Sequence, residues 1–254
     1  MIRRIILEQS HRAHVGHIGS CLSVVDILAV LYSDILKASD PSDQDRDRFI
    51  LSKGHSALAH YAALHLKGLV SAEQLNSFCT NGSYFGVHSD HRIAGVDFST
   101  GSLGQGFPFG VGAALAARLQ NSSRRIYVLL SDAECNEGSV WEAAMVAAHH
   151  RFANLTVIVD VNGQQAFGYT RDIVDLSPIG ARWAAFDWDV RNVDGHDSAA
   201  LKEALSRSST KPVAVIAKTV FGKGVSFMES QIKWHYFPMS DLEYQRAVSE
   251  VDAQ

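Results

Sequence analysis

The sequence contains few cysteines and no block of like charges. Among its 254 residues there are 3 cysteines, and none of them forms a CxxC pair. Such an odd, scattered set is typical of a reduced, cytoplasmic protein and argues against a disulfide framework. The 23 basic and 27 acidic residues give a formal net charge of -4 without a charged run. Binding to nucleic acid or to a membrane surface therefore has little support.

Long apolar segments are also missing. The apolar start, residues 1–7, is interrupted by Arg3 and Arg4 and is too short for the hydrophobic region of a signal peptide. No uninterrupted apolar stretch reaches the length needed to span a membrane. The composition, 46% hydrophobic and 20% charged, is that of an ordinary globular protein. Because there is no internal repeat and no low-complexity linker, we expect residues 1–254 to form a single domain.

Hydrophobic periodicity predicts helices that alternate with strands from about residue 104 onward. The predicted helices are 1–14, 22–37, 56–67, 72–79, 104–120, 139–150, 178–186, 198–207 and 241–253. The predicted strands are 49–51, 125–130, 155–160, 188–193 and 212–218, and the predicted loops are 16–20 and 81–103. This alternation predicts an α/β fold, with an open parallel sheet and helices on both faces. A loop as long as 81–103 is usually functional or disordered.

Polar residues follow two of the predicted strands. Asp132 comes after the strand at 125–130, and Asn162 comes after the strand at 155–160. If these strands are neighbours, the two side chains face each other at the carboxyl edge of the sheet, where ligands bind. Carboxylate and amide oxygens suit a hard cation such as Mg²⁺, and the helix that opens near residue 138 would favour phosphate groups. The alternative is that Asp132 caps a helix and Asn162 belongs to a turn.

Histidine is abundant, with twelve residues. Six of them lie in helix-like stretches and are expected to be structural: His11, His14, His60, His65, His149 and His150. The adjacent pair at 149 and 150 would point about 100° apart on a helix, which makes it a poor metal site.

An acidic turn followed thirty residues later by asparagine resembles the thiamine diphosphate fingerprint, Gly-Asp-Gly…Asn, with Asp132 and Asn162 in the two positions. Other segments narrow the resemblance to the transketolase family, and within it to the N-terminal subunit of split transketolases. They are His11-Arg12-Ala13 with Gly16-His17, Leu51-Ser52-Lys53-Gly54-His55, Ser99 to Gly106, Asn136-Glu137-Gly138, Lys218-Thr219 with Gly222-Lys223-Gly224, and Trp234-His235. They occur in the family's order and cover essentially the whole chain.

The resemblance implies the thiamine diphosphate-binding fold, in its diphosphate-binding domain, and two cofactors. A metal ion, Mg²⁺ or alternatively Ca²⁺ or Mn²⁺, would be held by Asp132, Asn162 and the carbonyl of Gln164. The residues implied to contact thiamine diphosphate are His55, Gly101, Ser102, Leu103, Asp132, Ala133, Glu134, Asn162 and His235. The residues implied to be catalytic are His17, His88, His235 and Glu137. The three histidines would line the reaction channel, and Glu137 would lie at a dimer interface.

Four positions depart from the family pattern. Ser131 and Ala133 replace both glycines of the fingerprint, and the methyl group of Ala133 would approach the diphosphate. Ile18 replaces the usual proline after His17, and Tyr236 replaces a glycine. The segment Gly104-Gln105-Gly106 does not fit a dinucleotide site, because the third glycine is missing and no strand precedes it.

The resemblance covers only the first of the three domains of a transketolase. The pyrimidine-binding domain, whose glutamate protonates the aminopyrimidine ring, is expected on a partner chain in an α2β2 complex. The implied reaction is transfer of a two-carbon ketol unit from a sugar-like ketose to an aldehyde. Two alternatives remain: the α subunit of a 2-oxo acid dehydrogenase or decarboxylase, and a non-catalytic subunit with a degenerate cofactor motif.

Overall fold

The protein is built around an open sheet whose strands are all parallel. We describe a computed structural model, which covers residues 1–37 and 40–254. The sheet has the order β1-β2-β3-β7-β6. Its strands are β1 (Arg48–Leu51), β2 (Ile126–Ser131), β3 (Leu155–Val161), β7 (Val213–Lys218) and β6 (Asp189–Asp194). Every neighbouring pair is parallel, so the predicted parallel sheet is confirmed.

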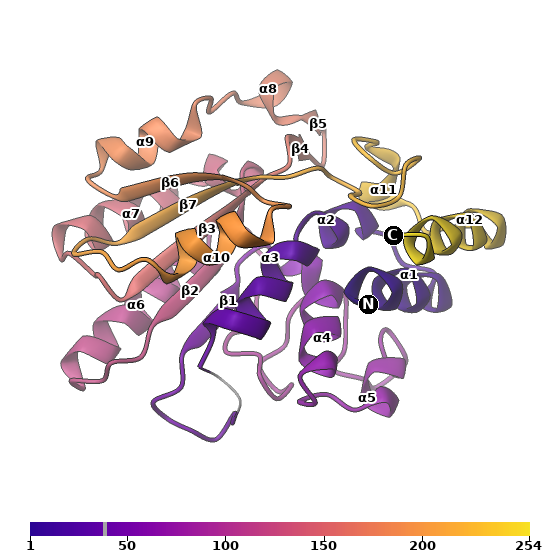
Figure 1. Ribbon diagram of the computed structural model, residues 1–254, viewed down its shortest axis with the longest axis horizontal. Helices are drawn as coiled ribbons and strands as arrows, with labels where there is room; N and C mark the ends of the chain where they lie inside the picture. The colour runs from indigo at the N-terminus through magenta and orange to yellow at the C-terminus, as the bar shows by residue number, and fades with distance from the viewer. Residues whose placement is uncertain (38–39) are drawn as a thin grey trace.

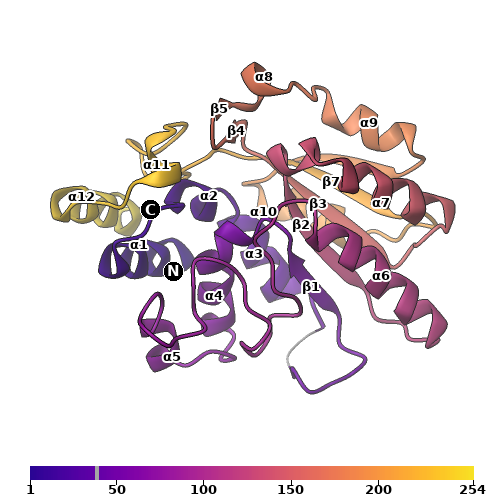
Figure 2. The ribbon, with the colours of Figure 1, turned by 180° about the vertical axis from the view of Figure 1, so that it is seen from behind.

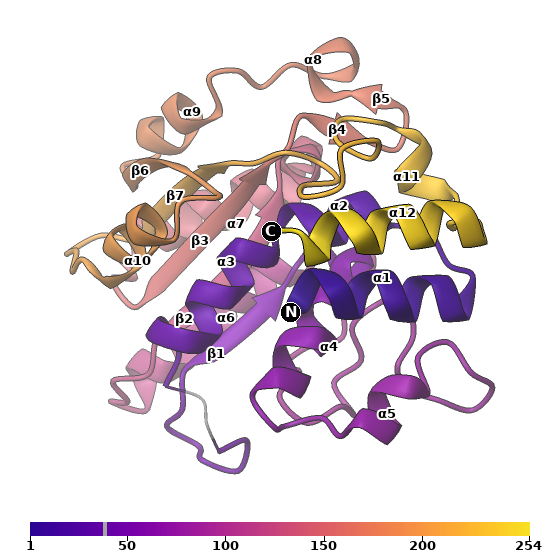
Figure 3. The same cartoon turned by 45° about the vertical axis from the view of Figure 1, so that its right-hand side comes forward.

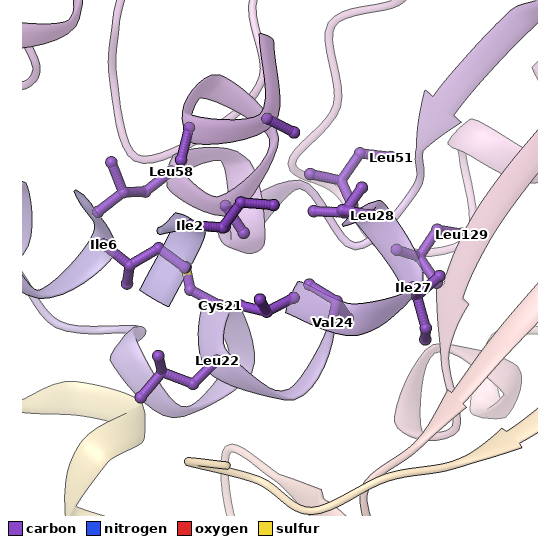
Figure 4. Packing of buried hydrophobic residues seen from close by; sticks show 14 of the residues in the cluster. Ile2, Ile6, Cys21, Leu22, Val24, Ile27, Leu28, Leu51, Leu58 and Leu129 are labelled. Carbon is purple, nitrogen blue, oxygen red and sulfur yellow. The ribbon is translucent and has the colours of Figure 1, made fainter. Parts of the chain in front are cut away.

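Helices cover both faces of this sheet, as predicted (Figures 1 and 2). One core cluster joins the sheet to α1 (Ile2–Ala13), α2 (Ile18–Ser23), α3 (Val25–Val30), α4 (Ala57–Leu66), α10 (Ser198–Ser206) and α12 (Asp241–Asp252). The other cluster joins the opposite face to α6 (Gly106–Leu119), α7 (Gly138–His149) and α9 (Ile179–Ala185). Figure 4 shows Ile27, Leu28, Leu51 and Leu129 packed where α3 meets the sheet. Burial of these two apolar surfaces is the main stabilising contribution to the fold.

Smaller elements complete the chain. They are a π-helical turn (Leu31–Ile35), 3₁₀ turns (Gly54–Ser56 and Ala133–Asn136), α5 (Ala72–Asn76), β4 (Gln164–Gln165), β5 (Gly168–Tyr169), α8 (Thr170–Ile173) and α11 (Lys233–Tyr236). Residues 81–103 contain no helix or strand, which agrees with the predicted loop. Helix α12 lies along α1 (Figure 3), where Arg4 pairs with Asp252 and the ring of His11 stacks on Tyr244.

Two predictions about local structure were wrong. The segment 16–20 was expected to be a loop, but α2 begins at Ile18. Gly19 lies inside this helix, where the Phe221 ring occupies the space that a β-carbon would need. The helix expected over 22–37 is interrupted at Val24 and passes through α3 into the π-helical turn, ending at Ile35.

No helix within residues 1–37 and 40–254 combines the length and apolar character required to cross a bilayer. Cys21, Cys79 and Cys135 are free thiols.

The buried His60 gives the fold a pH dependence. Its ring is almost fully buried, the Tyr32 hydroxyl lies 2.6 Å from Nε2, and burial lowers the pKa of His60 to about 3. In the unfolded chain a histidine has a pKa near 6.5, so the unfolded state binds a proton first as the pH falls. The free energy of unfolding therefore decreases progressively as the pH falls below about 6.5, because protonation of His60 in the unfolded state favours unfolding.

We expect the wild-type free energy of unfolding to fall by about 2 kcal/mol between pH 7 and pH 5 through His60 alone. In His60→Gln this part of the pH dependence should disappear. Urea unfolding at both pH values measures it, and His91→Gln, which alters an exposed histidine, is the control. An equal pH dependence in wild type and His60→Gln would contradict the assignment.

Candidate active site

A cavity of about 330 Å³ opens at the carboxyl ends of β1, β2 and β3. It is lined by His17, Ser20, His55, His88, Leu103, Ser131, Ala133, Asn136, Glu137, Asn162, Gln164, Gln165, Ala166, Phe167, Phe221 and His235. These residues come from segments far apart in the sequence that parallel pairing brings to one edge. No lysine or arginine is among the described residues that line it.

Asp132 and Asn162 lie together at this edge, as expected for neighbouring strands. Strands β2 and β3 pair in register, with Ser131 opposite Asp160. The Asp132 carboxylate accepts hydrogen bonds from the N–H groups of Ala133 and Gly163, both at 2.9 Å. Burial, followed by the nearby Asp160 carboxylate, raises the pKa of Asp132 to about 7. A buried carboxylate in this position favours a cation beside it.

The Asn162 amide and the Gln164 segment complete a set of oxygen donors. The Oδ1 atom of Asn162 accepts from the Gln164 N–H at 3.0 Å and retains a second lone pair. One carboxylate, one amide oxygen and a backbone carbonyl match the few protein ligands that Mg²⁺ usually takes. The described residues hold no group of three or more histidine, cysteine or acidic side chains arranged for a metal. A divalent ion here would therefore depend on phosphate and water for its remaining ligands.

Four imidazole rings gather at the cavity. The His17 ring centre lies 5.5 Å from that of His55, 6.5 Å from that of His88 and 5.2 Å from that of His235. Burial lowers the pKa of all four rings, well below the usual value for His55 and to about 4 for His235. All four are consequently neutral at pH 7, when each ring has one donor and one acceptor nitrogen.

Several buried polar atoms face no partner among the described residues. They include Nδ1 of His17, Nδ1 of His235 and both side-chain polar atoms of Gln164. Buried polar groups normally have hydrogen-bond partners, and an orphaned one is a candidate contact for a bound molecule. A polar ligand together with a divalent cation thus fits the donor set, the neutral rings and the lack of lysine and arginine in the described cavity wall.

The loop at residues 101–104 approaches the cavity on one side. Leu103 lines the cavity, whereas Ser102 is exposed and is not among the lining residues. A β-carbon on Gly101 would come within 3.3 Å of the His88 ring. Gly104 has a φ of +79°, and a β-carbon there would lie 2.7 Å from the Glu137 side chain. Glycine at 104 thus allows the loop to pack against the start of α7.

Glu134, which the resemblance implies as a cofactor contact, supports a loop beside the cavity. Its side chain is fully buried and is not among the residues that line the cavity. Its Oε1 atom accepts from the Ser52 hydroxyl at 2.5 Å and from the Gly104 N–H at 2.9 Å. Ser131 and Glu134 also exchange hydrogen bonds between side chain and backbone, in the manner of a capping box. Serine at the first fingerprint position therefore has a structural partner.

Ala133, at the second replaced fingerprint position, and Glu137 differ in their exposure to solvent. The Ala133 side chain lines the cavity, while its N–H group donates to Asp132. Glu137 precedes α7 at the cavity rim and is exposed. Nothing within the described chain covers this carboxylate, so it is accessible to another chain.

Four residues for which the sequence predicted no role also lie in this region. Lys53 and Asp160 form a fully buried ion pair behind Asn162, with 2.6 Å between Nζ and Oδ2. Phe167 and Phe221 line the cavity. The signal for Asp160 was present in the sequence: it is a charged residue inside a continuous apolar strand, two positions before Asn162.

Comparison with known proteins identifies similar chains. The family model described as transketolase, thiamine diphosphate binding domain, matches residues 1–251. The 6-deoxy-6-sulfo-D-fructose transketolase subunit SqwG of Clostridium sp. (strain MSTE9) is 38% identical, over 100% of this chain and 94% of that protein. An apulose-4-phosphate transketolase subunit of Phocaeicola vulgatus is 37% identical, over 98% of this chain and 90% of that protein.

Solved structures share the fold over nearly the whole chain. Transketolase from Campylobacter jejuni superposes with a TM-score of 0.93 and 31% identity, over 99% of this chain. This chain spans about 41% of the length of that solved protein. The cavity described above thus belongs to a fold that occurs both in short subunits and as one part of longer chains.

Proposed function

Because the chain belongs to the transketolase family, we propose that it supplies the diphosphate-binding half of a two-chain enzyme that transfers a two-carbon ketol unit to an aldehyde. The chain is a transketolase-type transferase subunit by its relatives. The observation that carries the proposal is the arrangement at the carboxyl edge of the sheet. Asp132 is hydrogen-bonded to the turn after β3, and Asn162 in that turn lines one cavity with four neutral imidazoles. The whole of residues 1–254 would serve as the diphosphate-binding domain.

The proposed cofactors are thiamine diphosphate and a divalent metal, Mg²⁺ or alternatively Ca²⁺ or Mn²⁺. Asp132, Asn162 and the Gln164 carbonyl would hold the metal. Thiamine diphosphate would lie against His55, Gly101, Leu103, Ala133 and His235. The cation would offset the diphosphate charge, since no lysine or arginine among the described residues lines the cavity.

The cavity histidines would bind the hydroxyl groups of the substrate and transfer protons. When bound, thiamine diphosphate supplies the carbanion-stabilising centre that receives the ketol unit. His17, His88 and His235 would bind the donor's hydroxyl groups, because a neutral imidazole both donates and accepts. Their lowered pKa values leave each ring able to take up a proton transiently and return it.

The relatives suggest the substrate class. The names of two similar subunits specify a sulfonated sugar and a sugar phosphate. Both are sugars with an anionic group, and we propose a ketose of that class as donor. No lysine or arginine of the described residues lines this cavity, so the partner chain would bind the anionic end. Free cysteines are compatible with the reducing cytoplasm, where we place the reaction.

The proposed assembly is α2β2. The partner would be a C-terminal transketolase subunit with the pyrimidine-binding domain. The outer surfaces of α6 and α7, side by side in Figure 2, expose Phe109, Leu115, Leu119, Met145 and Val146. An apolar surface of this kind is typical of a protein interface. We propose that two copies of this chain meet there, with Glu137 near the contact.

Product analysis with the reconstituted two-chain complex tests the proposed reaction. A ketose phosphate and an aldehyde should give a product two carbons longer than the acceptor. The same ketose without its phosphate should react more slowly. Release of CO₂ from a 2-oxo acid, without transfer from any ketose, would instead favour the decarboxylase alternative. Failure of the complex to bind thiamine diphosphate would favour the non-catalytic alternative.

The histidines should divide into two functional groups. We expect His17→Ala and His88→Ala to lower turnover roughly tenfold to a hundredfold with little change in cofactor affinity, because these rings would face substrate. We expect His55→Ala to weaken the cofactor instead. Steady-state rates across a cofactor titration separate the two effects. Identical behaviour of the three variants would show that this division is wrong.

A further inference from the structure

The buried ion pair of Lys53 and Asp160 lies directly behind the proposed metal site. Both side chains are completely excluded from solvent. A buried pair of this kind stabilises a fold little by comparison with apolar side chains of the same volume, because both charges lose their hydration. Its location behind the functional edge of the sheet therefore points to a role other than stability.

Asp160 accepts hydrogen bonds from four separate segments. Its Oδ2 atom receives Lys53 Nζ at 2.6 Å, the Ser23 hydroxyl at 2.8 Å and Asn162 Nδ2 at 2.8 Å. Its Oδ1 atom receives the Thr219 hydroxyl. With donors from α2, the end of β1, the turn after β3 and the end of β7, the carboxylate cannot rotate without breaking several bonds.

This network fixes which way the Asn162 amide faces. The NH₂ group is held by the Asp160 carboxylate, and the oxygen on the other side accepts from the Gln164 N–H. A rotation of the amide by 180° would place its oxygen against the carboxylate and its NH₂ against an N–H group. Both contacts would be repulsive, so the amide has one orientation.

We propose that Lys53 and Asp160 are positioning residues that hold the Asn162 oxygen toward the metal. The inference rests on the proposed function, since it concerns the same cation. Lys53 holds the Asp160 carboxylate in place through its hydrogen bond to Oδ2, and also donates to the Ser20 carbonyl at 3.3 Å. Removal of a residue that hydrogen-bonds to a metal ligand commonly changes metal affinity by about 10- to 100-fold.

The main test removes the pair while keeping its volume. In the two-chain complex, Lys53→Met/Asp160→Leu should weaken Mg²⁺-dependent binding of thiamine diphosphate at least about tenfold, as measured by calorimetry. Its urea unfolding midpoint should fall, because the Ser23 and Thr219 hydroxyls and the Asn162 NH₂ group lose their buried acceptor. Lys53→Met/Asp160→Asn restores an acceptor for Asn162 and should recover most of the lost affinity.

The control is a second buried ion pair at the other end of β1. Arg46 and Asp97 are 2.6 Å apart and mostly buried, and Asp97 also accepts from the Phe49 N–H. Asp97→Asn should change stability and leave cofactor affinity unaltered. Wild-type affinity in Lys53→Met/Asp160→Leu would overturn the proposal, as would failure of the asparagine variant to recover binding. Absence of binding in wild type would instead overturn the proposed function.

A cofactor-free measurement applies even if the leucine variant does not fold. In the wild-type chain, the side-chain NH₂ protons of Asn162 should exchange with solvent far more slowly than those of the exposed Asn121. Nuclear magnetic resonance resolves the two groups after assignment. Equal exchange rates would mean that the Asn162 amide is not held, and the proposal would be wrong.

Discussion

The isolated chain should show no ketol transfer, and activity should appear only on mixing with the partner. The expected difference is at least roughly a thousandfold, within the range contributed by a positioned acid or base. The reason is chemical, since activation of thiamine diphosphate needs a carboxyl group beside its aminopyrimidine ring. Glu137 is the only carboxylate among the described residues that line the 330 Å³ cavity, and it lies at the rim, exposed. The required carboxyl group must therefore come from elsewhere.

Hydrogen–deuterium exchange at C2 of bound thiamine diphosphate measures this activation without a substrate. Exchange should be slow with the chain alone and fast with the complex. Magnesium pyrophosphate is a useful control, because it tests whether the chain alone already binds the diphosphate part. Fast exchange by the chain alone would contradict the requirement for a partner, whatever the oligomeric state of the chain.

The sequence predicted the central sheet well because its signal is local. Buried parallel strands appear as short apolar runs, and the runs at 125–130 and 155–160 became β2 and β3. Neighbouring parallel strands then brought Asp132 and Asn162 together. The start of α2 was missed because the segment 16–20 contains two glycines, which are typical of loops. Only the folded structure shows that Gly19 leaves space for the Phe221 ring.

Features that depend on distant partners could not be predicted in the same way. Lys53 and Asp160 are 107 positions apart and meet only through the strand order β1-β2-β3. The position of Glu134 also depends on Ser52, which reaches it from the end of β1. The resemblance to a family identified the segments around these residues. It did not show that the Glu134 carboxylate supports a loop, or that the Asp160 carboxylate holds the Asn162 amide.

Asp132→Ala should abolish Mg²⁺-dependent binding of thiamine diphosphate while the fold remains intact. Asp132 is the only carboxylate among the proposed metal ligands, and the cation would be the main compensation for the diphosphate charge. Removing one member of a buried charge pair commonly costs about 3–5 kcal/mol, so affinity should fall at least about a hundredfold. Stability should change little, because loss of the hydrogen bonds to Ala133 and Gly163 is offset by removal of a buried carboxylate.

Two further variants separate the charge of Asp132 from its place in the turn. Asp132→Asn keeps an oxygen acceptor for the Gly163 N–H but removes the charge, and we expect it to bind the cofactor almost as poorly as the alanine variant. Asp194 is the matched control, because it also ends a strand at this edge and accepts a backbone N–H, from His196 at 2.9 Å. Unlike Asp132, it does not accept from the turn after β3. Asp194→Ala should bind normally. If calorimetry on the two-chain complex showed unchanged affinity in Asp132→Ala, Asp132 would be a turn residue alone, and the metal site would have to lie elsewhere.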